Sequence, residues 1–138
     1  MNIFQEYLNI IKILIKKNKK KLEIVDTNNF NGMTVESPPP EYNFDLSSNV
    51  CLILGKLNKI NPRLLAEKLK VIIINKNKNI KEVDIAGPGF INIKLSNTAI
   101  KKLILDINKN KNKYGSHLLK KKYNIEFVSA NPTGPMHV

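Results

Sequence analysis

The sequence contains no tryptophan, a single cysteine and a single arginine among its 138 residues. A lone cysteine cannot form an internal disulfide, and it has no second thiol at the spacing of a metal site. Cys51 lies within the apolar run 50–54. This position predicts a small buried side chain and not a nucleophile.

Long apolar runs are also missing. The run 71–74 ends at Asn75, and runs of this kind are far shorter than the roughly 20 residues that cross a membrane. Residues 1–6 have neither the basic start nor the small-residue cleavage site of a secretory signal. We therefore expect a cytoplasmic protein with no membrane partner.

Positive charge is abundant, with 23 basic against 11 acidic residues and a formal net charge of +12. Such an excess attracts polyanions such as nucleic acid. The chain is also rich in lysine, asparagine and isoleucine together, which an AT-rich coding sequence produces by drift. Arg63 is the only residue able to offer a bidentate guanidinium to phosphate. The charge alone therefore leaves a nucleic-acid partner and a merely solvated surface equally open.

The first half of the chain predicts helices and a hairpin. An apolar stripe of period 3.6 predicts a helix over residues 3–20, and two short runs at 22–25 and 33–36 predict a strand hairpin. Pro38-Pro39-Pro40 favours a stiff spacer over a ligand site. Ser47 or Ser48 is expected to cap a helix reaching Leu57. Asn61-Pro62 starts another, which runs to about Ile74.

The second half predicts two strands, a helix and a last strand. Alternating residues indicate strands at 83–86 and 90–95 around Gly87-Pro88-Gly89, and a helix from Asn97 with four residues facing inward: Ile100, Leu103, Ile104 and Ile107. Residues 125–129 read as a strand that leads into a polar loop. Because strands and helices do not alternate strictly, the order predicts an α+β fold, with a small antiparallel sheet and helices packed on one of its faces.

The C-terminal stretch 124–138, Asn-Ile-Glu-Phe-Val-Ser-Ala-Asn-Pro-Thr-Gly-Pro-Met-His-Val, has the pattern of a ligand site. In open α/β folds a strand delivers such a loop to the edge of the sheet where ligands bind. Gly134 permits close approach of a ligand, and Glu126 offers a carboxylate to a guanidinium. Taken alone, the residues favour a simpler interpretation, with Glu126 as a surface acid, Asn131 as a turn residue and His137 as an exposed histidine.

This stretch resembles the opening of the catalytic domain of arginyl-tRNA synthetases, where it continues Gly-His to complete the class I His-x-Gly-His element. The resemblance implies that Glu126, Ser129 and Asn131 contact arginine. It implies that Gly134 and His137 contact ATP. His137 would then be the catalytic residue that stabilises phosphate charge as the adenylate forms.

Residues 83–96 resemble a second element of the family, the Gly-Pro-Gly-Phe-Ile-Asn signature of its N-terminal additional domain. The resemblance implies that Phe90 and Asn92 contact the D-loop of the tRNA. Side chains two apart on a strand share a face, so one could stack on an unpaired base while the other reads its edge. The alternative is that Phe90 lies in the core and Asn92 is a strand-surface amide.

Two looser matches complete the resemblance. Phe44-Asp45 stands where the family usually has Gly-Asp, with Asn49 and Lys56 at family positions, and Tyr114-Gly115 resembles the linker before the catalytic domain. The resemblance implies a tRNA-binding domain at 1–115. It implies that 116–138 are a linker and the first strand of an incomplete Rossmann-like catalytic domain, cut within the His-x-Gly-His element.

The function implied is that of the N-terminal part of an arginine-tRNA ligase, which activates arginine with ATP and transfers it to tRNA(Arg). Mg²⁺ is expected with ATP in the full enzyme, but no metal ligands are assigned in this segment, which is expected to bind no cofactor alone. We expect a monomer, inactive as an isolated segment. A free-standing RNA-binding module and a decayed coding remnant remain alternatives.

Overall fold

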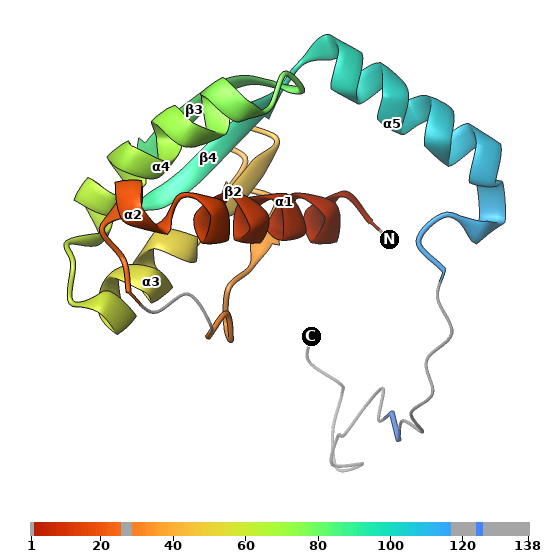
Figure 1. Cartoon of the computed structure of the whole chain (residues 1–138). Coiled ribbons are helices and arrows are strands. Elements are labelled where there is room, and N and C mark those ends of the chain that lie inside the picture. Colours follow the sequence, from red (N-terminus) through yellow and green to blue (C-terminus); the bar gives the residue numbers. More distant parts are fainter. Residues whose placement is uncertain (1, 26–28, 117–123, 126–138) are drawn as a thin grey trace, which may run out of the picture.

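The computed structural model describes residues 2–25, 29–116 and 124–125 (Figure 1). Five α-helices, four strands and a short 3-10 helix are assigned within these residues. In chain order they are α1 (Ile3–Lys17), α2 (Lys19–Leu22), β1 (Val35–Glu36), β2 (Leu46–Ser48), α3 (Val50–Asn58), α4 (Pro62–Lys76), β3 (Ile80–Ala86), β4 (Phe90–Leu95), α5 (Asn97–Asn110) and η1 (Lys111–Lys113).

The strands form one antiparallel sheet in the order β1-β2-β4-β3. Residues paired directly across strands point to the same face. One row of such pairs is apolar and buried, and joins Leu46, Ile93 and Val83. The row beside it faces the other way and crosses all four strands as Glu36, Ser47, Asn92 and Asp84. The sheet therefore has an apolar face and a polar face.

Helices α1 and α4 cover the apolar face, and α3 packs against α4 and β4 (Figure 1). The core side chains of the helices include Ile11, Ile15, Leu54, Leu65 and Leu69, all at most 1% exposed. The predicted α+β fold with helices on one face of a small sheet is confirmed. Its polar face is left for other contacts.

Local signals fix the helix starts. Asn61 accepts hydrogen bonds from the backbone N–H groups of Arg63 and Leu64, with Pro62 in the first helical position, as predicted. Ser96 caps α5 by accepting from the N–H of Ala99. Asn2 caps α1 in the same way through the N–H of Gln5. Each cap satisfies a donor that has no partner within the helix.

The predicted N-terminal hairpin is wrong. Leu22 ends α2, and Glu23 leaves the helix in the left-handed conformation at φ 56°. The strand at Val35–Glu36 does form, but it pairs with β2 at Leu46–Ser48, a segment where the sequence predicts a helix cap. Leu22 and Ile24 are buried all the same. A short apolar run predicts which side chains are buried, but it does not distinguish a strand from the end of a helix.

The predicted cap position at Ser47 or Ser48 is too early, because Leu46–Ser48 is a strand and Asn49 is the N-cap residue of α3, although the side chain of Asn49 makes no cap bond. The hydroxyl of Ser48 donates to the carbonyl of Thr34 at 2.8 Å. The same hydroxyl accepts from the N–H of Val50, the first residue of α3, at 3.3 Å, so Ser48 supports the helix start from its place in the strand.

Helix α5 departs from the prediction in its packing. Ile104 and Ile107 were expected to face inward, yet they are 52% and 39% exposed. Ala99 is buried, Ile100 packs against the core and Leu103 is half-buried, whereas the end of the helix extends away from the body (Figure 1). An amphipathic period indicates that a helix has an apolar face, but it does not indicate which part of a protein packs against that face.

The end of the chain lies largely outside the described residues. Asn124 and Ile125 have no regular secondary structure, and residues 126–138 are not described. The expected first strand of a Rossmann-like domain and the domain boundary after residue 115 therefore stay predictions. In the described part of the chain, no helix is both long enough and apolar enough to cross a membrane.

The buried position of Cys51 in α3 gives a first test of the fold. Burial raises the pKa of its thiol to about 12, and only the thiolate reacts with alkylating agents. We expect iodoacetamide at pH 8 to label the native chain at least about a hundredfold more slowly than the chain in urea. Mass spectrometry would measure both rates at this single cysteine. Equal rates would contradict the packing of α3.

Candidate nucleic-acid interface

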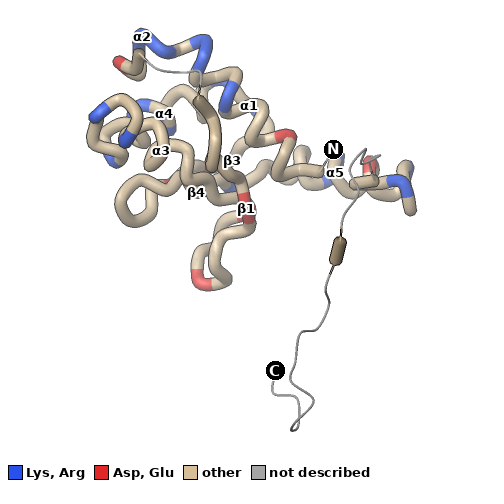
Figure 2. The backbone as a smooth tube through the Cα atoms, turned by 90° about the horizontal axis from the view of Figure 1, so that it is seen from below, with Lys and Arg blue, Asp and Glu red and all other residues tan. Residues whose placement is uncertain are grey.

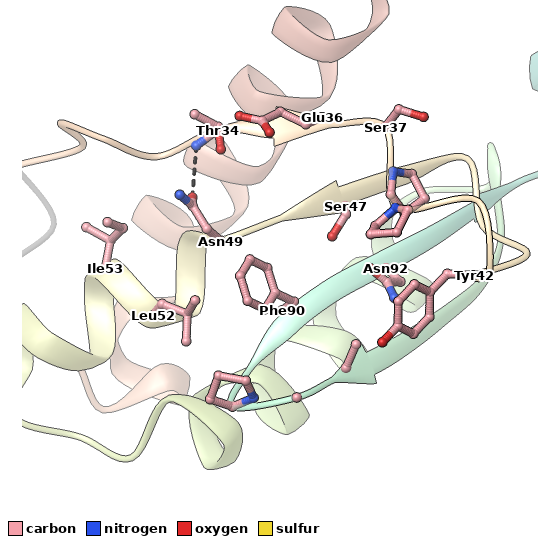
Figure 3. Close-up of a pocket in the computed structure, with 15 residues that line it drawn as sticks. Thr34, Glu36, Ser37, Tyr42, Ser47, Asn49, Leu52, Ile53, Phe90 and Asn92 are labelled. Carbon is pink, nitrogen blue, oxygen red and sulfur yellow. Dashed lines mark hydrogen bonds between the residues drawn. The ribbon is translucent and has the colours of Figure 1, made fainter.

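A cavity of about 560 Å³ lies on the polar face of the sheet (Figure 3). Its floor is formed by β2 and β4, one wall by residues 36–42, and another by the start of α3. The turn between β3 and β4 closes one end. Three separate segments of the chain, 34–42, 47–53 and 86–92, therefore meet around one cavity.

Phe90 and Asn92 both line this cavity, as expected from their spacing on β4. Phe90 is 37% exposed, so it is not a core residue. Asn92 is only 2% exposed, so it is not a surface amide. Neither alternative from the sequence holds for these two residues.

The carboxamide of Asn92 has an unusual position. In the described part of the chain, no group hydrogen-bonds to it, although the residue is almost fully buried. Among the described residues, no side-chain nitrogen or oxygen that is sealed from solvent lacks a hydrogen-bond partner, so the polar atoms of Asn92 are open to the water of the cavity. Its place in the cavity lining (Figure 3) means that the missing partner can come from a bound molecule.

The proline run is part of the cavity and not merely a spacer, which corrects the sequence interpretation. Pro38 and Pro39 line it together with Tyr42, whose ring is drawn on the side of Asn92 away from Phe90 (Figure 3). Tyr42 is 43% exposed. Its backbone N–H donates to the carbonyl of Pro39 at 3.0 Å, which closes a turn.

Two anchors hold this wall against β4. The ammonium of Lys94 donates to the backbone carbonyl and the side-chain oxygen of Asn43, at 2.9 and 2.6 Å. A carboxylate oxygen of Asp45 accepts from the N–H of Leu95 at 2.7 Å. Phe44, which replaces the usual family glycine, does not have a positive φ. The turn therefore tolerates a side chain there.

Asn49 ties the start of α3 to the chain before β1. Its side-chain oxygen accepts from the N–H of Thr34, and its amide donates to the carbonyl of Gly32, both at 2.9 Å (Figure 3 draws the first). The family resemblance had marked this position without giving it a role. Here it holds the rim of the cavity in place.

The Gly87-Pro88-Gly89 turn is seated on the start of α4. Gly89 has φ +139°, and a Cβ there would lie 2.9 Å from the carbonyl carbon of Pro62. The guanidinium of Arg63 donates through Nη1 to the carbonyl of Gly87 at 2.8 Å. Two motifs that are separate in the sequence thus form one structural unit beside the cavity.

The residues expected to bind arginine and ATP are not placed by the structure. Glu126, Ser129, Asn131, Gly134 and His137 all lie outside the described residues. Over residues 2–25, 29–116 and 124–125, no group of three His, Cys, Asp or Glu side chains could hold a metal ion. The site that the described residues do form is the cavity around Phe90 and Asn92.

The sheet face, with an exposed ring beside a buried amide, has the features of modules that bind unpaired bases. Residues 9–95 match the family model of the arginyl tRNA synthetase N terminal domain. The chain therefore belongs to this family, and it corresponds to an N-terminal segment of an arginyl-tRNA synthetase.

Curated relatives agree along the whole chain. It is 44% identical to the arginine–tRNA ligase of Pelagibacter ubique over 100% of this chain and 24% of that protein. Identity is 39% to the ligase of Bartonella henselae over 95% of this chain, and 38% to that of Agrobacterium fabrum over 100%. In each case the chain spans about a quarter of the relative's length. The family resemblance inferred from the motifs is confirmed.

Proposed function

We propose that this chain is the tRNA-docking segment of an arginine–tRNA ligase, and that its cavity receives one unpaired base of the D-loop of tRNA(Arg). The observation that carries the proposal is the Asn92 carboxamide, 2% exposed and without a partner among the described residues, in a cavity of about 560 Å³. A volume of this size is typical of small-ligand sites, which range from roughly 300 to 1,000 Å³.

The chemistry of the cavity suits a nucleobase. The ring of Phe90 offers a face for stacking, and the ring of Tyr42 provides a second aromatic wall. The carboxamide of Asn92 has both donors and an acceptor, so it can pair with the edge of a base. Because Asn49, Asp45 and Lys94 hold the walls in place, little ordering would be needed on binding.

The activity of the whole enzyme belongs to the proposal as well. It would activate arginine with ATP to the adenylate and transfer the arginyl group to the 3′ end of the tRNA. Glu126, Ser129 and Asn131 would bind arginine, while Gly134 and His137 would bind ATP, with His137 stabilising charge on the phosphate. Magnesium would accompany ATP and help to neutralise its phosphates. Docking at the D-loop would orient the tRNA for this reaction.

Replacement of Phe90 by leucine tests the docking step. Leucine keeps an apolar side chain of similar size but has no ring to stack, and stacking on one aromatic side chain is worth about 1–3 kcal/mol. We expect the Phe90→Leu chain to bind tRNA(Arg) about fivefold more weakly at a fixed 0.1 M salt. Filter binding or fluorescence anisotropy would measure the affinity.

Phe30→Leu is the matched control, because Phe30 is an aromatic residue outside the cavity that lies beside the ammonium groups of Lys12 and Lys16. It should leave the affinity unchanged. A tRNA(Arg) with one D-loop base removed should bind wild type and Phe90→Leu equally. If both variants bind tRNA(Arg) like wild type and the affinity changes only with salt concentration, the docking proposal is wrong. The lysine excess then attracts tRNA non-specifically.

A further inference from the structure

The single arginine of the chain stands at the edge of the cavity. Arg63 is exposed, and its Nη1 donates to the carbonyl of Gly87, a residue that lines the cavity. A guanidinium has five N–H donors in a fixed plane. Within the described residues, the bond to Gly87 is the one hydrogen bond that the Arg63 side chain makes. The other donors remain for a ligand.

The corner between α3 and α4 is positively charged. Lys56, Lys59 and Arg63 lie on it, and the sequence has no acid between Asp45 and Glu67. Among the described residues, none of these three cations forms an ion pair with an acid. Figure 2 shows blue bands close to the α3 and α4 labels. Packing within the corner is close, since a Cβ on Gly55 would lie 2.8 Å from the carbonyl oxygen of Ile60.

The opposite ends of the polar row are negatively charged. Glu36 and Asp84 occupy the two edge strands in direct register with Ser47 and Asn92, and both acids are exposed. A phosphate near these carboxylates would be repelled, whereas one near the α3–α4 corner would be attracted. The electrostatic potential therefore differs between the sides of the cavity. The side at the Gly87–Gly89 turn is the favourable one for a nucleic-acid backbone.

We propose that Arg63 binds a phosphodiester phosphate of the nucleotide whose base occupies the cavity. This inference rests on the proposed docking of a D-loop base. The bond to Gly87 holds the guanidinium at the rim, so less side-chain freedom is lost when a phosphate binds. The same side chain therefore positions the turn that carries the cavity wall and offers its remaining donors to the phosphate. Lys56 and Lys59 add attraction without a fixed contact.

Arg63→Gln tests the contact, because glutamine keeps a polar side chain with amide donors but has no charge. Neutralising one phosphate contact changes the slope of log K against log salt by about 0.7–0.9. We expect the slope for tRNA(Arg) to become shallower by this amount, and the affinity at 0.1 M salt to fall about threefold to tenfold. Arg63→Lys should keep the wild-type slope.

Lys101→Gln is the matched control, since it removes the same charge from an exposed position on α5. Its slope should remain that of wild type. If Arg63→Gln and Lys101→Gln have equal slopes, the phosphate contact is wrong, even where Phe90→Leu still weakens binding. If Phe90→Leu also has no effect, the docking proposal fails with it. The cavity of the Arg63→Gln chain can be checked separately. If this variant prefers intact tRNA over base-deleted tRNA by the same factor as wild type, its cavity is preserved.

Discussion

Replacing Gly89 by alanine is expected to lower the free energy of unfolding by about 2–5 kcal/mol, from backbone strain and overpacking together. At φ +139° an alanine is strained whatever space surrounds it, and here its Cβ would also lie 2.9 and 3.0 Å from the carbonyl carbon and oxygen of Pro62. These are backbone atoms, so they cannot rotate out of the way. Relief requires the β3–β4 turn to lift from α4.

Gly87→Ala is the matched control in the same turn. Gly87 has φ +52° and no atom within 4 Å of the position of a Cβ, so we expect a cost of only about 1–2 kcal/mol. Urea unfolding followed by circular dichroism would give both values, and each kcal/mol should lower the melting temperature by about 4–8 °C. Equal losses for the two alanine variants would show that the turn is not seated on Pro62.

Asn92→Leu should weaken the binding of tRNA(Arg) while leaving the stability of the chain nearly unchanged. The variant removes a carboxamide that has no partner among the described residues and is open to the water of the cavity, so little stability should be lost or gained. It also removes the hydrogen bonds to the base, worth about 1–3 kcal/mol, so affinity should fall roughly tenfold to a hundredfold. Thermal melts and binding curves on the same sample would measure both effects.

The matched control is Asn49→Leu, which makes the same chemical change at a residue whose carboxamide is fully engaged. The N–H of Thr34 and the carbonyl of Gly32 would both lose their partner, so stability should fall by about 1–3 kcal/mol. Of the two variants, only Asn49→Leu should thus lower the melting temperature clearly. A loss of stability in Asn92→Leu as large as in Asn49→Leu would mean that Asn92 is a structural residue.

Elements that depend on neighbouring residues could be predicted from the sequence. The start of α4 followed from Asn61-Pro62, and the β3–β4 hairpin followed from alternation on both sides of a glycine-rich turn. Strand β2 could not be predicted in this way. It has three residues and pairs with β4 far along the chain, so no local period identifies it.

For the candidate site as well, the residues set by local pattern could be predicted and those set by long-range contacts could not. Phe90 and Asn92 were found through the family resemblance, and their common face follows from the period of a strand. Tyr42 and the contact of Arg63 with Gly87 were missed, because both depend on how distant parts of the chain return to the sheet.

The strand order also bears on how the cavity assembles as the chain folds. The β3–β4 hairpin joins residues that are close in sequence, whereas β2 must find β4 across the length of α3, α4 and β3 to pair Leu46 with Ile93. Closing the longer loop costs more chain entropy. Phe90 and Asn92 can therefore be in place on a formed hairpin before Ser47 and Tyr42 arrive, and the hollow between them becomes complete only when the most distant contacts have formed.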